Sequence, residues 1–266
     1  MEGRWVEVGD GVFARRYREL DLTIGLVLGG ERALVVDTRG DERQGAELAT
    51  AVHVVTALPV SVAITHAHFD HCFGTAAFLP CPVHALPRCR AVLAATAAEQ
   101  REAWSTTYRQ RGDHRTADAI ESTDPPLPDA AAPATIDLGG RTVELIHLGR
   151  GHTDHDLLVH VADAGVVFAG DLVEQGASPQ LGDDAVVPDW PGTLTALLAL
   201  GPSTVVPGHG DPVGTGFVAA QRDRLAEVAA LYAAVATGEL DTVQAQRRSP
   251  YPDVPWPKCE PSTRGK

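Results

Sequence analysis

Apolar residues along this chain fall into two patterns. Short runs rich in Val, Ile and Leu, bounded by Gly, Pro or Asp, are typical of buried strands. We expect such strands at residues 22–30, 32–38, 59–68, 81–86, 135–148, 156–162, 165–171 and 204–210. Apolar positions at helical spacing predict helices at residues 41–55, 74–79, 87–111, 193–201 and 217–238. Strands that alternate with helices in this way indicate an α/β fold.

Two stretches have no such periodicity. Residues 112–135, which contain TDPPLPDAAAPAT, are expected to be the loosest part of the folded domain. The C-terminal residues are polar and rich in Pro, a composition that supplies few apolar side chains for burial. We therefore expect one domain over residues 1–236 and a poorly ordered tail over residues 237–266.

Composition limits the function classes. The chain has 266 residues, of which 44% are hydrophobic, so it can bury a substantial core. Its formal net charge of −13 disfavours nucleic acid as a partner, because the average surface repels phosphates. The first residues do not have the pattern of a secretory signal, and no apolar run is long enough to span a membrane. Four cysteines without CxxC spacing, expected to be reduced, agree with a cytoplasmic location.

The segment THAHFDHCFG, at the end of a predicted strand, is the strongest chemical signal in the chain. It contains His66, His68, Asp70 and His71. In an extended segment, positions i, i+2 and i+4 face the same way, so His66, His68 and Asp70 can converge. His71 can turn toward a neighbouring point. Imidazole and carboxylate ligands at this spacing suit zinc or a similar metal.

Three further residues with the same chemistry each follow a predicted strand. His152 lies in GRGHTDHD, Asp171 in VVFAGDLV and His209 in VVPGHGDP. Open α/β folds collect their sites at the carboxyl ends of strands, so these side chains can join the first four. We expect one metal to be held by His66, His68 and His152. A second metal would be held by Asp70, His71 and His209, and Asp171 would bridge the two metals.

Together, these motifs resemble those of the metallo-β-lactamase-fold hydrolase superfamily. Its HxHxDH motif matches residues 66–71, and its later His, Asp and His match His152, Asp171 and His209. Asp37, in VVDT at the end of an early strand, matches the structural Asp that supports the metal loop in the family. The resemblance implies a four-layer αβ/βα sandwich with the metals at one edge of two packed sheets.

By this resemblance the protein is a hydrolase with two zinc ions per chain, although iron or manganese could occupy the same ligands. A water shared by two metals has a lowered pKa, so the resulting hydroxide can attack an ester, lactone, thioester or amide of a small molecule. Asp70 would orient this hydroxide. Asp37 and Thr153 would fix the orientation of the ligand histidines.

The ligand types separate this chain from some members of the superfamily. Classical metallo-β-lactamases are secreted and lack an Asp at the position of Asp171, and flavo-diiron proteins carry Glu where His68 stands. A persulfide dioxygenase with one iron uses part of the same ligand set and is the alternative enzyme. A metal-binding scaffold without turnover is the non-catalytic alternative. Nothing in the sequence indicates an oligomeric state.

The loop around His152 departs from the commoner family form PGHTxG, because it reads GRGHTDHD. His155 in this loop, and Glu174 after the next predicted strand, could contact substrate or donate protons from the outer part of the site. The alternative for both is a solvated loop residue. Trp190 could form an apolar wall of the substrate pocket, or it could be a packed core residue.

Overall fold

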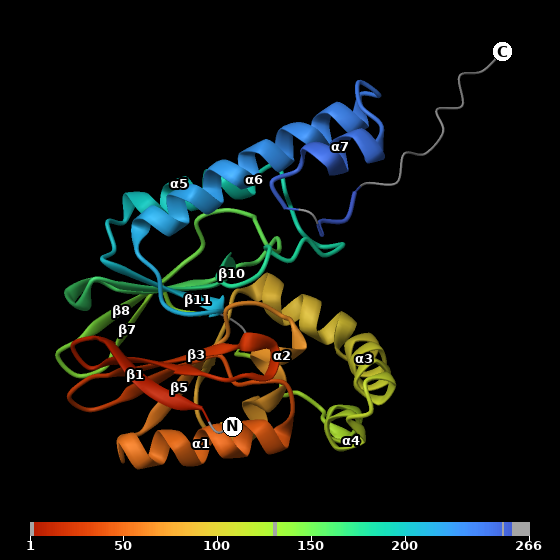
Figure 1. The fold of residues 1–266 in the computed structure, drawn as a ribbon. Coiled ribbons are helices and arrows are strands. Elements are labelled where there is room, and N and C mark those ends of the chain that lie inside the picture. Colours follow the sequence, from red (N-terminus) through yellow and green to blue (C-terminus); the bar gives the residue numbers. More distant parts are fainter. Residues whose placement is uncertain (1–2, 130–131, 252, 257–266) are drawn as a thin grey trace.

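Two β-sheets form the centre of the computed structural model, which describes residues 3–129, 132–251 and 253–256 (Figure 1). The first sheet has the strand order β1-β2-β3-β4-β5-β6, and the second has the order β11-β10-β9-β8-β7. The strands of the first sheet are β1 Arg4–Gly9, β2 Val12–Arg16, β3 Thr23–Leu28, β4 Ala33–Val36, β5 Val60–Ala63 and β6 Val83–His84. Those of the second are β7 Thr135–Asp137, β8 Thr142–Ile146, β9 Leu158–Val161, β10 Val166–Glu174 and β11 Thr204–His209.

Helices connect these strands in chain order. They are α1 Glu42–Val55, α2 Phe69–Cys72, α3 Pro87–Gln110, α4 His114–Ser122, α5 Trp190–Ala199, α6 Thr215–Ala236 and α7 Thr242–Arg248. Short 3-10 turns are η1 Glu19–Asp21, η2 Phe73–Phe78 and η3 Ala162–Ala164. Strand β5 is parallel to both β4 and β6, and β10 is parallel to β11. Parallel neighbours need crossover connections, and helices supply them here.

Helices cover the outer face of each sheet (Figure 1). Helix α1 begins where the Asp41 side chain accepts the N–H of Gln44 at 2.7 Å, which satisfies one of the free donors at the helix start. Leu48 on α1 is fully buried and packs in the same apolar cluster as Leu93 of α3 and Ile120 of α4. This cluster lies against the first sheet.

Three apolar clusters separate four layers of secondary structure. The middle cluster lies between the sheets and combines Leu34 of β4 with Val159 of β9. The second outer cluster joins Val205 of β11 with Leu194 of α5 and Leu225 of α6. The α/β fold and the four-layer sandwich expected from the sequence are therefore confirmed.

Local differences from the sequence-based expectations have simple causes. The strand predicted at residues 59–68 ends at Ala63, because the chain turns into the short helix α2. Residues 112–135 contain α4, which Asp113 caps by accepting the N–H of Thr116 at 3.0 Å. Strands β1 and β2 were not predicted, since basic and polar residues interrupt their apolar runs.

Part of the C-terminal segment is ordered, so the expectation of a poorly ordered tail is wrong for that part. Asp241 and Gln244 form a capping box at the start of α7. Tyr251 and Val254 are buried in the cluster that includes Leu225. Residues 257–266 of the expected tail lie outside the described residues. None of the helices in the described part of the chain combines the length and apolar character that a membrane crossing requires.

Candidate metal centre

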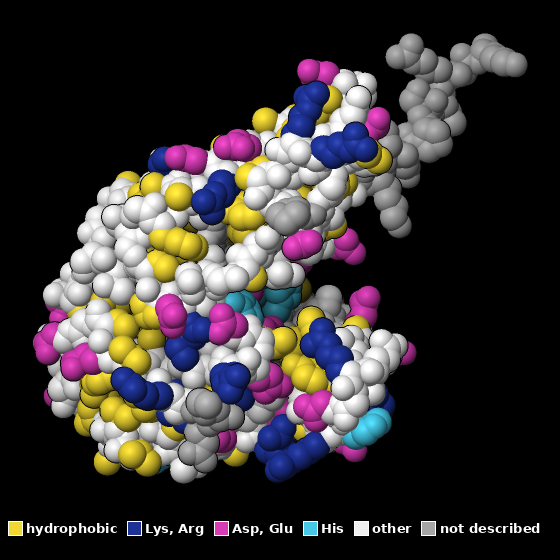
Figure 2. Space-filling model, in the orientation of Figure 1, with side chains coloured by type: hydrophobic (Ala, Val, Ile, Leu, Met, Phe, Trp, Pro, Cys, Tyr) yellow, Lys and Arg dark blue, Asp and Glu magenta, His cyan; other side chains and the backbone are white. Residues whose placement is uncertain are grey.

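Seven imidazole and carboxylate side chains meet where the edges of the two sheets approach each other. They come from the loop after β5, from α2, from the loop before β9, and from β10 and β11. These residues are His66, His68, Asp70, His71, His152, Asp171 and His209. Figure 2 shows histidine side chains in the hollow between the two halves of the molecule. The structure therefore brings together every residue expected from the sequence to bind metal.

Four of these residues form a first group, in which one ligand atom from each lies within 4.8 Å of the others: His66, His68, His152 and Asp171. His152 Nε2 lies 3.0 Å from His68 Nδ1 and 3.5 Å from Asp171 Oδ2. His66 Nε2 lies 3.8 Å from the same oxygen. Since metal–nitrogen bonds are about 2 Å long, these separations leave room for one ion among the four side chains.

A second group consists of Asp70, His71 and His209. His209 Nε2 lies 3.4 Å from both Asp70 Oδ2 and His71 Nε2. The idea that Asp70 converges with His66 and His68 along one extended segment is therefore wrong. His68 is the N-cap of α2, so Asp70 lies on a helical turn and faces His71 and His209 instead.

Asp171 lies between the two groups. Its Oδ1 is 3.2 Å from His71 Nε2, and its Oδ2 is 3.2 Å from His209 Nε2, although Asp171 also belongs to the first group. Gly208 on the neighbouring strand β11 makes this position possible. A Cβ atom at residue 208 would lie 1.9 Å from Asp171 Oδ1, so any side chain there would displace the carboxylate.

Backbone carbonyls fix two of the histidine rings from outside. His152 Nδ1 donates to the carbonyl of Gln180 at 3.1 Å, and His209 Nδ1 donates to the carbonyl of Leu20 at 2.7 Å. Since a carbonyl oxygen only accepts, each Nδ1 carries the proton of the neutral ring. The Nε2 of His152 then turns a lone pair toward the centre, and the Nε2 of His209 does so once it has lost its own proton, as metal ligands require.

Asp37 supports both groups from one buried position. Its Oδ2 lies 2.8 Å from His71 Nδ1 and also accepts the hydroxyl of Thr65 at 2.8 Å. That hydroxyl lies 3.0 Å from His66 Nδ1. Asp37 has a φ of +66°, a left-handed conformation that costs a residue other than Gly about 1–3 kcal/mol. These contacts agree with the expected role of Asp37 as the support of the metal loop.

Two histidines of the first group differ in protonation from the histidines of the second group. Burial holds the pKa of His66 well below its usual value and lowers the pKa of His152 to about 4. Burial also opposes protonation of His71 and His209, but nearby carboxylates, chiefly Asp171, outweigh it. The pKa of His71 is well above its usual value, and that of His209 rises to about 10. Protons therefore neutralise the carboxylates of the second group when no cation is bound.

Among the described residues of the centre, His66 Nε2 and Asp171 Oδ1 are buried atoms that make no hydrogen bond, although Asp171 Oδ1 faces His71 Nε2 at 3.2 Å. Leaving a buried polar atom unpaired costs about 1–3 kcal/mol. A cation among the inward lone pairs and carboxylate oxygens would satisfy both atoms. Mixed nitrogen and oxygen ligands suit zinc, iron or manganese, so the residues present fit a metal centre.

Two of the other candidate residues lie in the loop after His152. Thr153 donates its N–H and its hydroxyl to the carboxylate of Asp156, and so shapes its own loop. His155 is buried, and its Nε2 accepts the N–H of Ala67 at 3.2 Å. Ala67 stands between the two ligands His66 and His68 in the chain. His155 therefore positions the metal loop through this hydrogen bond and does not face solvent.

Glu174 and Trp190 are buried residues that contact the protein around the metal ligands. Glu174 Oε1 accepts the N–H of Gln180 at 2.6 Å, and burial raises the pKa of this carboxyl to about 8. Trp190 is fully buried and donates from Nε1 to the carbonyl of Leu172 at 3.0 Å. Its ring lies 5.8 Å from the His152 ring, centroid to centroid. Trp190 is therefore a packed residue behind His152, not an exposed wall of a substrate pocket.

Asp184 is a site residue that the motifs did not indicate. Its Oδ2 lies 3.0 Å from His68 Nε2, on the side of the ring opposite the nitrogen that faces His152. Burial disfavours protonation of His68, but the Asp184 carboxylate outweighs it and raises the pKa of the ring. Asp184 follows Asp183 in the loop before α5, and nothing in this acidic pair marks either residue as a partner of His68.

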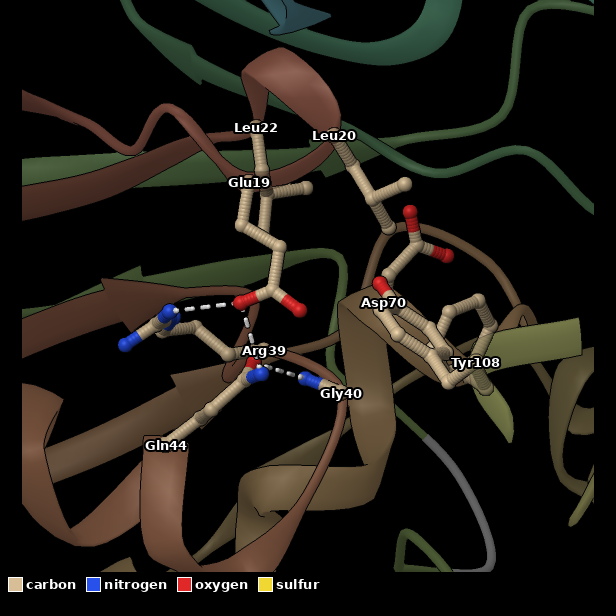
Figure 3. A pocket seen from close by; sticks show the side chains of 9 residues that line it. Glu19, Leu20, Leu22, Arg39, Gly40, Gln44, Asp70 and Tyr108 are labelled. Carbon is tan, nitrogen blue, oxygen red and sulfur yellow. Dashed lines mark hydrogen bonds and ion pairs between the residues drawn. The ribbon is translucent and has the colours of Figure 1, made fainter. Parts of the chain in front are cut away.

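Solvent reaches the centre on one side. The partly exposed side chains there are His68, His209 and Asp70, at 29%, 15% and 11% exposure. A pocket adjoins this open side and shares Asp70 with the second group (Figure 3). It is lined by Glu19, Leu20, Leu22, Arg39, Gly40, Gln44, Phe69, Asp70 and Tyr108. A substrate would approach the centre from this side.

Comparisons with known proteins agree with this geometry. Two metallo-beta-lactamases type 2 are similar in sequence. That of Bacillus cereus is 28% identical over 220 residues, which cover 78% of this chain and 73% of that protein. That of Bacteroides fragilis is 34% identical over 88 residues, so the match covers 32% of this chain and 35% of that protein.

The fold is shared with solved structures. The structure of a metallo-beta-lactamase from Pontibacter korlensis superposes with a TM-score of 0.63 at 20% identity, over 84% of this chain and 99% of that one. The family model described as metallo-beta-lactamase superfamily matches residues 19–209, which include all seven residues of the two groups. With the sandwich fold and this match, the chain belongs to the metallo-beta-lactamase superfamily.

Proposed function

We propose that this protein is a hydrolase that uses two metal ions, zinc in the first instance, to cleave an ester, lactone, thioester or amide bond of a small molecule. The observation that carries the proposal is the convergence of two ligand groups whose outward nitrogens are already bound by acceptors. One ion would be held by His66, His68 and His152, the other by Asp70, His71 and His209, and Asp171 would touch both.

Bound metal ions lower the pKa of a coordinated water and polarise the oxygen of the bond to be cleaved. The chain's own residues supply orientation. Asp70 lies at the open side and can accept a hydrogen bond from the attacking water, which aims it at the substrate. Burial opposes ionisation of Asp171, but His209 and His71 outweigh it and hold its pKa well below the usual value. Asp171 therefore stays ionised between the two groups.

A small molecule is the substrate class that the charge of the chain favours. The net charge of −13 repels phosphate backbones, so nucleic acid is not proposed as a substrate. A membrane is not proposed as a partner, and a cytoplasmic location is part of the proposal. The names of the Bacillus cereus and Bacteroides fragilis relatives support including a β-lactam among the amides to be tested.

Metal counting and a substrate panel test the proposal together. The panel contains chromogenic esters, lactones, thioesters, a phosphodiester and a cephalosporin. About two zinc ions per chain with hydrolysis of a panel member would support the hydrolase. About one iron per chain with oxygen uptake in the presence of a persulfide would support a sulfur dioxygenase instead. Full metal content without any turnover would support a metal-binding scaffold.

A further inference from the structure

The pocket beside Asp70 contains a carboxylate that neither metal group uses. Glu19 projects from η1 into the pocket, and Tyr108 of α3 stands opposite it (Figure 3). Gln44 Nε2 donates to Glu19 Oε2 at 2.8 Å, and Arg39 Nη2 lies 3.5 Å from the same oxygen. Both partners bind one oxygen, so they hold the Glu19 carboxylate in place from one side.

The arginine charge near Glu19 lies on the buried side of the pocket wall. Arg39 Nη1 is closer to Glu47, at 2.9 Å, and its guanidinium lies 3.7 Å from the centre of the Tyr17 ring. Glu47 also binds Arg15 at 2.6 Å. The Arg39 side chain is 9% exposed, whereas that of Glu19 is 32% exposed. Arg39 also lines the pocket, but it is bound by Glu47 as well, so the Glu19 carboxylate is the more exposed of the two charges on this wall.

Tyr108 completes the polar part of the pocket. Its hydroxyl faces Glu19 in the pocket, and burial together with that carboxylate raises the pKa of the phenol well above its usual value. Tyr108 thus remains a neutral group whose oxygen can accept a further hydrogen bond. Phe69 and Leu20 supply apolar walls, and the Phe69 ring stacks on Trp104 at 4.4 Å between centroids.

Size and charge together select the group that fits. The pocket is small, with room for a group of about the size of one water molecule. A carboxylate or a phosphate is larger and would meet Glu19 and Asp70 with like charge. A primary ammonium group is about the size of water, has three donors and carries the opposite charge.

We propose that this pocket is a subsite for a primary ammonium group of the substrate, recognised by the Glu19 carboxylate and the Tyr108 hydroxyl oxygen. Asp70 lines both the pocket and the second metal group, so the ammonium group lies next to the bond that is cleaved. The place of the subsite in catalysis rests on the proposed function. It narrows the substrate class to small esters, lactones, thioesters or amides with an amino group near the reacting carbonyl.

Direct binding tests the subsite without turnover. Isothermal titration of the metal-loaded protein compares n-butylammonium chloride with n-butanol at equal ionic strength. Charge-assisted hydrogen bonds should make the ammonium ion bind at least about tenfold more tightly than the alcohol. Glu19→Gln keeps the shape and removes the charge, so this preference should disappear. The control is Glu239→Gln, which removes a negative charge from an exposed position after α6. This variant should retain the preference for n-butylammonium over n-butanol.

A second variant keeps the test decisive if Glu19→Gln does not fold. Tyr108→Phe removes the hydroxyl alone and should weaken n-butylammonium binding severalfold, with n-butanol binding unchanged. Equal binding of the two probes to the wild type, as expected if the pocket holds only water, would overturn the subsite. An unchanged preference in Tyr108→Phe and in every folded Glu19→Gln sample would do the same.

Turnover then separates the subsite from the proposed function. Paired chromogenic esters, one with an amino group near the carbonyl and one with a methyl group in its place, are compared by kcat/KM. The amino ester should be preferred at least about tenfold by the wild type and not by Glu19→Gln. Binding of n-butylammonium without hydrolysis of any panel member would sink the hydrolase and leave the subsite standing. Hydrolysis of both esters without a preference for the amino ester would support the hydrolase and overturn the role of the subsite in substrate selection.

Discussion

His152 Nε2 and His68 Nδ1 lie 3.0 Å apart, although 84 positions separate the two residues in the chain. The other nitrogen of each ring is bound by an acceptor. His152 Nδ1 contacts the carbonyl of Gln180, and His68 Nε2 contacts the carboxylate of Asp184. A single proton shared by the two nitrogens can satisfy this contact in the metal-free protein. Binding of a metal ion by the first group would require the loss of that proton, because the two nitrogens would then act as ligands.

Removal of one ligand from the first group should remove metal and activity together. We expect His66→Ala to lose at least one metal ion per chain and all measurable hydrolysis, because the loss of a direct ligand exceeds the 10–100-fold effect of an outer contact. Metal analysis of the purified variant, beside kcat/KM, checks this. His53→Ala, at an exposed position of α1, is the matched control. Wild-type metal content in His66→Ala would show that this residue is not a ligand.

Asp171→Ser tests the bridge between the groups. The first group keeps three histidines, so we expect one metal to stay and the second to bind weakly. Loss of one electrostatic stabiliser at a reacting centre typically lowers kcat by about 10²–10³-fold. Metal counting, melting temperature and kcat are measured on the same sample. Two metals with normal kcat would contradict the bridge, and loss of all metal would favour a site for one ion.

Asp37→Asn tests the support of the metal loop. The carboxylate accepts three hydrogen bonds, from the N–H and the hydroxyl of Thr65 and from His71 Nδ1, whereas the amide has a single acceptor oxygen. At least one of these contacts is therefore lost, which loosens the ring of His71 and, through Thr65, that of His66. We expect metal affinity to fall by about 10–100-fold while the fold is kept. Competition with a chromogenic chelator measures the affinity. Asp223→Asn, on the exposed face of α6, should leave it unchanged.

Sequence reasoning found the ligands because they lie in short motifs, and it missed residues whose role depends on tertiary contacts. The spacing of His66, His68 and His71 is visible in one segment of the chain. The contact of Asp184 with His68 joins residues 116 positions apart, and no local pattern marks it. The extended-strand argument failed for Asp70 because the start of α2 after His68 overrides strand periodicity.

The same distinction applies to the pocket and the tail. Glu19 meets Tyr108 only because η1 and α3 pack on the same side of the metal centre. The tail was expected to be poorly ordered from its Pro content. Its sparse apolar residues, Tyr251 and Val254, are nevertheless placed where the second core cluster can bury them. The composition of a segment does not show which of its few apolar residues will be buried, so it could not predict that Tyr251 and Val254 dock.

Metal binding to the second group should depend steeply on pH. In the metal-free protein, the carboxylates, chiefly Asp171, outweigh burial and raise the pKa of His209 to about 10, so the ring is protonated at neutral pH. A ligand must lose its proton before it binds metal, so affinity falls as pH falls below 10. Each displaced proton should change the affinity by about tenfold per pH unit.

The first group provides the internal comparison for this pH dependence. Burial lowers the pKa of His152 to about 4 and holds that of His66 well below its usual value, so both rings are neutral at pH 7. Only His68, whose pKa is raised by Asp184, brings a proton to displace in the first group, whereas both His71 and His209 do so in the second. We therefore expect the second metal to be lost before the first as pH is lowered from 9 to 6. Metal content after dialysis at each pH measures the order of loss. Simultaneous loss of both metals would contradict the assignment of protons to His209 and His71.

The ordered part of the C-terminal segment should stabilise the fold without affecting the metal centre. Tyr251 is 7% exposed and packs in the cluster beside α6, so Tyr251→Ala should lower the free energy of unfolding by about 3 kcal/mol. Val243→Ala, at a side chain that is 58% exposed on α7, should change it by less than about 0.5 kcal/mol. Urea unfolding measures both, and metal content of the folded fraction should match the wild type. An unchanged unfolding midpoint in Tyr251→Ala would show that this segment does not contribute to the second core.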